Sequence, residues 1–230
     1  MKSENNEFLT YDILKGYTIA LSLKNKNYVN ENDMSFNSDE NEKNRQNFFT
    51  KLGINDLFKV RNKQIHSKII HRAEKGITKE GDGLFSTDYD YALYLLTADC
   101  YNIFFTTDNG RTFGCLHAGW KGIIEGIVEE SLKLFKGETE VVVLQGICEK
   151  HFVVENDVME IFRKRFKDSY IKRVENKFSI DLRKIINDIL DKDAYVKNID
   201  LCNVCSKDIL FSYREGDTLK RNISVIWRKI

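Results

Sequence analysis

Thr97-Ala98-Asp99-Cys100 and the later His117-Ala118-Gly119-Trp120-Lys121-Gly122 bound the stretch that decides how this chain folds. The apolar run Tyr91–Thr97 leads into it and predicts a buried strand that ends at Asp99 and Cys100. Cys100 and His117 are chemically reactive residue types, and their position at the ends of apolar runs is typical of a site built at a sheet edge.

The residues between these two motifs predict a β-hairpin. One apolar run covers Asn102–Thr107, another covers Thr112–His117, and Asp108-Asn109-Gly110 separates them. Asp, Asn and Gly between two apolar runs are a strong hairpin signal because they tolerate the left-handed conformations of a tight turn. We therefore expect Cys100 and His117 to lie at the same edge of a sheet.

A helical pattern follows from Ile123 to about Phe135 and stops near Gly137. Two glycines flank Trp120 and Lys121 just before it. The start of a helix offers free N–H groups and a positive dipole end to an anionic substrate.

The remaining chain contains short strands and helices without a linker or an internal repeat. Helices are predicted at Glu42–Leu52, Asp157–Phe166 and Leu182–Leu190, the last capped by Ser179 or Asp181. Strands are predicted at Tyr17–Leu23, Leu57–Ile70 (one bent strand or a pair), Val141–Leu144, Tyr195–Ile199, Ile209–Tyr213 and Ile223–Trp227. We expect one mixed α/β (α+β) domain over residues 1–230.

Composition excludes several classes of protein. The 230 residues are 42% hydrophobic and 31% charged, which is typical of a folded domain rather than a disordered chain. A net charge of +1 gives no electrostatic reason to expect nucleic acid or an anionic membrane as a partner. No apolar run has membrane-spanning length, and the N-terminus is polar. With five cysteines and no export signal, we expect a cytoplasmic protein with reduced thiols.

Cys100, His117 and His66 are the residues that best suit a catalytic metal. Three protein ligands with a fourth position left for water are typical of catalytic zinc sites. Spacing alone leaves two other interpretations open. Cys100 could be a small core residue beside hydrogen-bonded histidines, or a nucleophile with His117 as its base, as in thiol hydrolases.

The other cysteines and histidines give no comparable pattern. Cys202 and Cys205 form a CxxC pair, but there is no second CxxC to complete a zinc ribbon, so we interpret the pair as structural or coincidental. Cys148 stands alone, and His151 is expected on a surface or loop. Arg214 ends an apolar run, where its forked donors could bind an anion.

These motifs carry a resemblance to a known family. Thr97–Cys100, His117–Gly122, Gln64-Ile65-His66 and Phe211-Ser-Tyr-Arg214 resemble motifs of the laccase-domain, or multicopper polyphenol oxidase-like, proteins. These proteins are also called peptidoglycan editing factors, and a human relative is a macrophage purine-metabolism enzyme. The resemblance covers about residues 10–230. It implies a layered α/β/β/α fold with mixed sheets.

The resemblance also implies a site and an activity. His66, Cys100 and His117 match the family's metal ligands, with zinc as the usual occupant and copper as another. The implied reactions are phosphorolysis of adenosine, inosine and methylthioadenosine to base and ribose 1-phosphate, a transferase reaction, and adenosine deamination, a hydrolase reaction. Purine nucleosides and phosphate are therefore the expected partners. No oligomeric state is predicted.

Further roles are assigned to residues near this trio. Asp99, next to Cys100, is a candidate acid, although strand alternation equally suits a residue that orients the site. Arg214, Lys121 and Gln64 are the expected substrate-binding residues, with Arg214 and Lys121 facing phosphate. Two segments depart from the family pattern. Leu23-Lys24-Asn25 is the best match to the family's Ser-Thr-Arg-x-Gly-Gly segment, and Leu144–Glu149 lacks both prolines of its Gly-Pro-x-Ile-Gly-Pro sequence.

Three other functions remain as alternatives. A thiol hydrolase acting on peptidoglycan precursors would use Cys100 and His117. A copper-dependent phenol oxidase is disfavoured, because four histidines are too few for a multicopper cluster. A non-enzymatic interaction protein is the third alternative, and the intact His66, Cys100 and His117 trio argues against it.

Overall fold

The predicted hairpin is present and forms the middle of a mixed sheet. β8 (Tyr101–Thr107) pairs antiparallel with β9 (Thr112–Ala118), and Asn102 lies opposite His117. Asp108, Asn109 and Gly110 all have positive φ, as the tight turn requires. The structure is a computed structural model, and it describes residues 2–4, 7–12 and 14–229.

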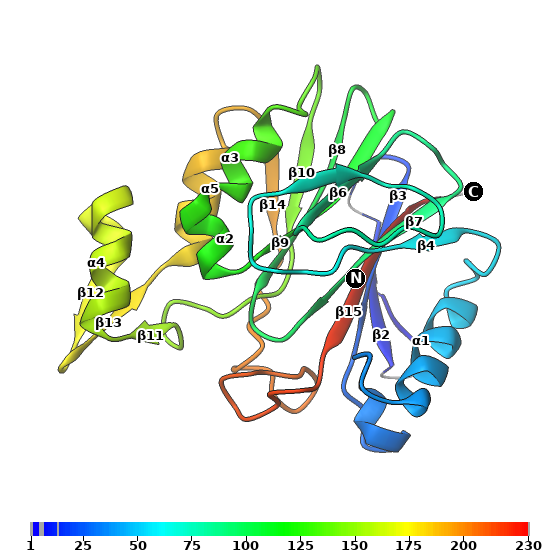
Figure 1. The fold of residues 1–230 in the computed structure, drawn as a ribbon, viewed down its shortest axis with the longest axis horizontal. Coiled ribbons are helices and arrows are strands. Elements are labelled where there is room, and N and C mark those ends of the chain that lie inside the picture. Colours follow the sequence, from blue (N-terminus) through cyan, green and yellow to red (C-terminus); the bar gives the residue numbers. More distant parts are fainter. Residues whose placement is uncertain (1, 5–6, 13, 230) are drawn as a thin grey trace.

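The strands of these residues form two large sheets and a small one (Figure 1). The first large sheet has the order β1 (Lys2–Glu4), β2 (Phe8–Tyr11), β3 (Tyr17–Ser22), β15 (Asn222–Arg228), β7 (Tyr91–Thr97) and β4 (Phe58–Val60). The second has the order β14 (Tyr195–Asn198), β10 (Glu140–Val143), β8, β9, β6 (Gly83–Ser86) and β5 (Ile70–Arg72). Both are mixed, because β4 and β7, β5 and β6, and β10 and β14 pair in parallel.

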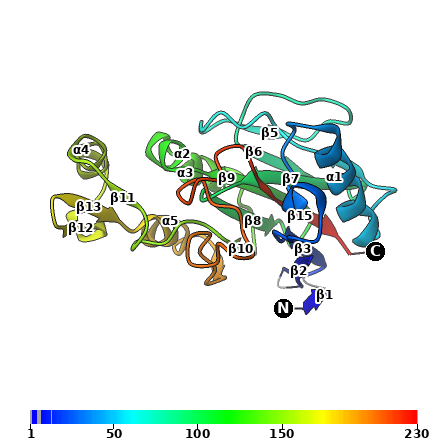
Figure 2. The ribbon, with the colours of Figure 1, turned by 90° about the horizontal axis from the view of Figure 1, so that it is seen from below.

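Helices lie outside the two large sheets. They are α1 (Asp39–Lys51), α2 (Trp120–Glu125), α3 (Ile127–Leu132), α4 (Asn156–Arg165) and α5 (Leu182–Leu190), with short 3-10 helices at Val29–Asn32 and Asp168–Tyr170. The small sheet has the order β11 (Val153–Val154), β13 (Lys177–Ile180) and β12 (Ile171–Val174). Figures 1 and 2 show it beside α4, at the end of the molecule opposite α1.

Buried side chains define the layers. Along β7, Leu93 and Leu95 point into the core between the sheets, whereas Ala92 and Tyr94 point into the core under α1. Along β8, Phe104 points into the core between the sheets, and its neighbours face α2, α3 and α5. Strands buried on both faces appear in sequence as continuous apolar runs. The order is therefore α/β/β/α with mixed sheets, as expected.

Several predicted elements are confirmed. β7 has the bounds predicted for its strand, and α5 has the bounds predicted for its helix, with Asp181 as the N-cap that accepts a hydrogen bond from the Lys184 amide. α4 agrees to within a residue. None of the helices in the described residues combines the length and hydropathy that a membrane span needs.

Other predicted elements were wrong. The helix after Gly119 begins at Trp120 and breaks at Gly126, whose φ of +97° ends α2 and starts α3. The segment 209–213 forms turns rather than a strand, because side chains satisfy its buried backbone: Asn222 accepts the Phe211 amide, and Asn203 donates to the Phe211 carbonyl. Between β4 and β5 the chain is irregular, so His66 lies in a loop and not in a strand.

Candidate active site

His66, Cys100 and His117 meet, although they come from three separate segments. Cys100 lies in the turn between β7 and β8, His117 lies in β9, and His66 lies in the loop between β4 and β5. Their ligand atoms are all within 4.8 Å of one another. Cys100 Sγ is 3.8 Å from His66 Nε2, and the two imidazole rings have centroids 4.8 Å apart.

Two of the residues in this region have left-handed backbone conformations. His66 has a φ of +60° and Asp99 a φ of +87°. Residues other than glycine rarely adopt positive φ, and those that do often lie at functional sites. Here the unusual conformations turn the chain where the His66 loop and the end of β7 approach β9.

Asp82, which the sequence analysis did not single out, holds two parts of this site together. Its fully buried carboxylate accepts hydrogen bonds from His117 Nδ1 at 2.7 Å and from the His66 amide at 3.0 Å through Oδ1. Through Oδ2 it accepts the amides of Ile65 and Ser67 and the Ser67 hydroxyl, at 3.2, 2.6 and 2.8 Å. One carboxylate thus fixes the His66 loop and directs His117 Nε2 toward Cys100.

Neighbouring charges and hydrogen bonds shift the pKa values of three groups in this site. Burial would raise the pKa of the Cys100 thiol, but the charge and hydrogen bond of His117, together with His66, lower it to about 6. Burial would lower the pKa of His117, but Cys100 and Asp82 raise it to about 9. Burial would also raise the pKa of Asp82, whereas His117 and Ser67 lower it to about 2. The arrangement therefore favours a thiolate at Cys100 and a carboxylate at Asp82.

The donor set fits a zinc-type ion. One thiolate and two imidazole nitrogens are typical ligands of such ions, and three protein ligands leave a position for water or substrate. A carboxylate on the far nitrogen of a ligating histidine is the usual support that fixes its tautomer and orientation. Asp82 provides that support for His117.

The trio lies in the wall of a cavity of about 700 Å³. This volume is within the range of small-molecule sites. The lining combines cations (Arg61, Lys63, Arg214, Arg221), aromatic rings (Phe36, Trp120, Phe152, Tyr213), polar groups (Ser35, Asn37, Gln64, Thr97, Asp99) and apolar side chains (Leu96, Ala98, Ile147, Leu182, Leu219) around the trio.

Three of the cations donate side-chain hydrogen bonds to backbone carbonyls. Arg214 donates to the Val153 carbonyl at 3.0 Å, Arg61 to the Asn62 carbonyl, and Arg221 to two neighbouring carbonyls. These carbonyls are neutral acceptors, so they do not cancel the guanidinium charges. Lys63 differs, because it forms an ion pair with Glu80 at 2.9 Å. The cavity is therefore suited to an anionic group.

Asp99 and Arg214 both line the cavity and contact each other. The Asp99 carboxylate accepts the Ser212 hydroxyl at 2.7 Å and the Arg214 amide at 2.8 Å. Burial raises the pKa of Asp99, and these two hydrogen bonds oppose that shift. With both oxygens engaged by the loop that carries Arg214, Asp99 is placed as a group that positions that loop.

Gln64 and Lys121 are placed differently from their expected roles. The Gln64 side-chain amide donates to the Leu96 carbonyl and accepts the Leu96 amide, both at 2.9 Å. It lines the cavity but uses its amide to dock the His66 loop onto β7. Lys121 is exposed, its ammonium group lies over the Trp120 ring, and it is not among the residues that line the cavity.

Gly119 leaves just enough room for the trio. Its φ of −70° is open to any residue, but a Cβ there would lie 2.6 Å from His66 Cδ2 and 3.0 Å from Cys100 Sγ. We expect Gly119→Ala to displace these two side chains and reduce turnover about 100-fold, since a misplacement of about 1 Å can have that effect. Thermal unfolding should change little. Unchanged turnover would show that these two side chains need not keep their positions.

A second group of ligand side chains lies outside the cavity lining and corrects two expectations. Cys148, His151, Cys202 and Cys205 bring their ligand atoms within 4.8 Å of one another. The CxxC pair is therefore not isolated and Cys148 does not stand alone, whereas His151 lies in a turn, as expected. The signal in the sequence was Cys148-Glu149-Lys150-His151, a pair with the same spacing as Cys202 and Cys205.

Comparisons with known proteins agree with the resemblance. Residues 24–229 match the family described as multi-copper polyphenol oxidoreductase laccase. A Campylobacter jejuni protein named purine nucleoside phosphorylase Cj1217c is 32% identical over 196 residues, which cover 80% of this chain and 84% of that protein. A Haemophilus influenzae protein named purine nucleoside phosphorylase is 30% identical over 179 residues, which cover 71% of this chain and 72% of that protein.

Solved structures share the fold. The Bacillus licheniformis hypothetical protein YfiH aligns with a TM-score of 0.87 at 20% identity and covers 98% of both chains. The Neisseria meningitidis protein NMB0706 aligns with a TM-score of 0.86 at 23% identity, covering 97% of this chain and all of that one. The shared fold therefore covers almost the whole chain.

Proposed function

The chain belongs to the multi-copper polyphenol oxidoreductase laccase family, and on that premise we propose that it is a zinc-dependent purine nucleoside phosphorylase. Adenosine, inosine and methylthioadenosine are the substrates we assign, with adenosine deamination as a second reaction. The observation that carries the proposal is the meeting of His66, Cys100 and His117 in the wall of one cationic cavity. The names of the relatives supply the class of reaction.

Zinc is the metal we assign to the trio. When bound, it would supply Lewis-acid chemistry and lower the pKa of water. Copper could use the same three ligands, but a multicopper cluster needs many more histidines. The chain has four, of which His71 bonds the Glu80 carbonyl and His151 belongs to the second group.

Phosphorolysis requires an anion site beside the sugar. A phosphate oxygen forms a bond to C1′ while the bond from C1′ to the purine breaks, and the purine leaves with the electron pair and takes up a proton. Arg214 is the residue we assign to phosphate, aided by Arg61 and Arg221, since guanidinium groups bind phosphate through paired donors. Aromatic rings such as Phe152 and Tyr213 offer surfaces on which a purine can stack.

The phosphate assignment predicts a selective effect of Arg214→Ala. A charge-assisted hydrogen bond contributes about 1.5–3 kcal/mol, so the KM for phosphate should rise about 10- to 100-fold, with a smaller change in the KM for the nucleoside. Lys121→Ala is the matched control and should leave both values unchanged, because Lys121 lies outside the cavity lining. Initial rates at varied phosphate measure both. A phosphate effect in Lys121→Ala alone would reverse the assignment.

Product analysis separates the two reactions assigned to adenosine. Adenine that forms only when phosphate is present indicates phosphorolysis, whereas inosine that forms without phosphate indicates deamination. A single chromatographic run that resolves adenine, inosine and hypoxanthine reports both. If zinc-loaded protein forms neither adenine nor inosine, that result contradicts the proposed function.

A thiol hydrolase is the second candidate, because Asp82, His117 and Cys100 are also arranged as a carboxylate, a base and a nucleophile. The two functions differ in their need for metal. A hydrolase would keep its activity on peptide substrates after chelation and lose it on treatment with iodoacetamide. A metal-dependent phosphorylase would lose activity on chelation and recover it with zinc.

A further inference from the structure

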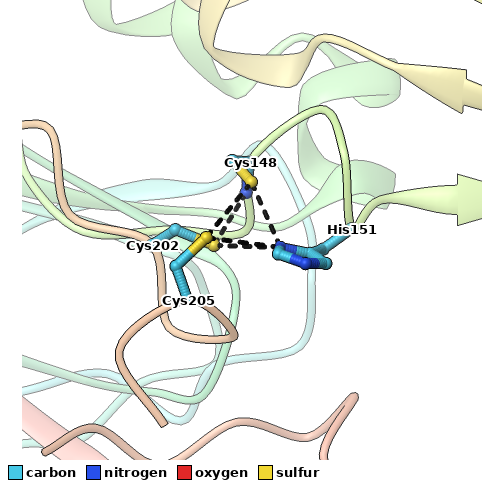
Figure 3. A group of neighbouring side chains, drawn as sticks. All are labelled: Cys148, His151, Cys202 and Cys205. Atoms are coloured by element: carbon cyan, nitrogen blue, oxygen red, sulfur yellow. Dashed lines mark hydrogen bonds between the residues drawn. The ribbon is translucent and has the colours of Figure 1, made fainter.

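Cys148, His151, Cys202 and Cys205 form a second cluster of metal ligands, shown in Figure 3. Cys148 and His151 lie in the loop after β10, and Cys202 and Cys205 lie in the turn after β14. About fifty residues of sequence separate the two pairs. Their approach is therefore a product of the tertiary fold.

Backbone contacts hold both pairs in matching turns. The amides of His151 and Phe152 both donate to the Cys148 carbonyl at 3.0 Å, and the Ser206 amide donates to the Cys202 carbonyl at 2.9 Å. A parallel bridge between Gly146 and Cys202 joins the two segments. Each pair thus presents its two side chains from a single turn, as in paired knuckles around one ion.

The distances between ligand atoms match the edges of a tetrahedron around zinc. Sulfur ligands at about 2.3 Å and nitrogen at about 2.0 Å place two sulfurs roughly 3.8 Å apart, and a sulfur and a nitrogen roughly 3.5 Å apart. Here Cys148 Sγ is 4.0 Å from Cys205 Sγ. His151 Nδ1 is 3.3, 3.7 and 3.6 Å from the sulfurs of Cys148, Cys202 and Cys205.

The chemistry of the donors favours a structural metal over a disulfide. Three thiolates and one imidazole form a complete Cys₃His set with no position left for water or substrate, which is typical of structural zinc. The Cys148 amide donates to Cys202 Sγ at 3.3 Å, a contact that stabilises a thiolate. A disulfide requires sulfurs about 2.05 Å apart, and all five cysteines are free.

We propose that this cluster binds a structural zinc ion, separate from the metal of the His66–Cys100–His117 site. The ion would cross-link the loop after β10 to the segment that leads into Ser212 and Arg214. Ile147 and Phe152 flank the cluster's first pair and line the cavity, and the Ile147 amide donates to the Asp99 carbonyl at 2.7 Å. The zinc therefore holds one wall of the cavity in place.

Metal stoichiometry in a set of single and double variants tests this proposal. The wild type should retain about two zinc ions per chain, Cys100→Ala about one, Cys205→Ser about one, and the double variant none. Cys205 is exposed, so its conservative replacement removes a ligand without opening the core. Cys115→Ala is the matched control, since Cys115 is a buried thiol outside both clusters, and it should retain two ions.

Cobalt provides a second readout that does not depend on activity or on stability. In Cys100→Ala protein titrated with Co²⁺, three thiolates should give an intense thiolate-to-metal absorption band with tetrahedral bands in the visible. Cys205→Ser and His151→Gln in that background should weaken these bands and lower the affinity. Removing the ion should also lower the melting temperature, because a structural metal stabilises the folded chain.

Three results would overturn the proposal. One is Cys100→Ala protein that is folded, fully reduced and unable to bind zinc or cobalt. Another is a mass 2 Da below that of the reduced chain in freshly purified protein, with peptide mapping that joins two cysteines of the cluster in a disulfide. The third is equal zinc content in Cys205→Ser and the wild type.

Discussion

Cys100→Ala protein is expected to lose the metal of the His66–Cys100–His117 site and at least about 100-fold in kcat/KM for adenosine phosphorolysis. The thiolate is the anionic ligand of the trio, and alanine leaves two neutral imidazoles to hold a divalent ion. Metal analysis and adenine release, measured on the same preparation, check both effects. The protein should remain folded, because Cys100 is only partly buried and lies in a turn.

Cys115→Ala is the control for this variant. Cys115 lies on the same hairpin, but its side chain points into the core between the sheets. Its loss should reduce stability slightly and leave kcat/KM unchanged. Full activity in Cys100→Ala would remove the trio from the mechanism. Full metal content without activity would instead support the nucleophilic role of Cys100.

Asp82→Asn is expected to have the next largest effect, on both metal affinity and stability. Each carboxylate oxygen of Asp82 accepts two or more hydrogen bonds, so either orientation of an asparagine amide would point its NH₂ group at N–H donors. We expect an unfolding free energy lower by roughly 3 kcal/mol, from hydrogen bonds lost in a buried site. Metal affinity should fall about 10- to 100-fold.

Metal competition against a chelator and chemical denaturation measure these two losses. Asp88→Asn is the control, because Asp88 is an exposed carboxylate paired with Arg72, and its replacement should change stability by less than about 0.5 kcal/mol. A stable Asp82→Asn protein with normal metal affinity would show that the carboxylate does not support the ligands.

The hairpin and its two ligands could be predicted because their signals are local. Continuous apolar runs bounded by Asp108–Gly110 fix β8 and β9, and the pairing then places Cys100 near His117. His66 could not be placed in this way. Its residue type made it a candidate ligand, but it lies in an irregular loop held by hydrogen bonds to Asp82, which no local pattern predicts.

The role of Asp82 could not be predicted, because the residues around it give no sign of a buried carboxylate. It stands between Gly81 and Gly83 in a stretch that looks like a charged loop, and its five hydrogen bonds come from residues that are distant in sequence. The second cluster was missed for a different reason. Its other half is the pair Cys148 and His151, which has the spacing of a CxxC pair but a histidine in place of the second cysteine.

The placement of Arg214 also depends on contacts that the sequence does not reveal. The segment 209–213 has the composition of a strand. Asn203 and Asn222 nevertheless form hydrogen bonds with its backbone, and Asp99 accepts the amide of Arg214, the next residue along the chain. These contacts hold the segment in turns. Those turns place Arg214 at the cavity. A strand of the same sequence would give a different direction to this side chain.

The most direct test of the phosphorylase assignment is detection of ribose 1-phosphate by ³¹P NMR in a reaction of zinc-loaded protein with adenosine and phosphate. We predict ribose 1-phosphate and adenine in equal amounts, with neither formed by Cys100→Ala protein. Free ribose in place of ribose 1-phosphate, or equal product from Cys100→Ala protein, would contradict the assignment of this site to metal-dependent phosphorolysis.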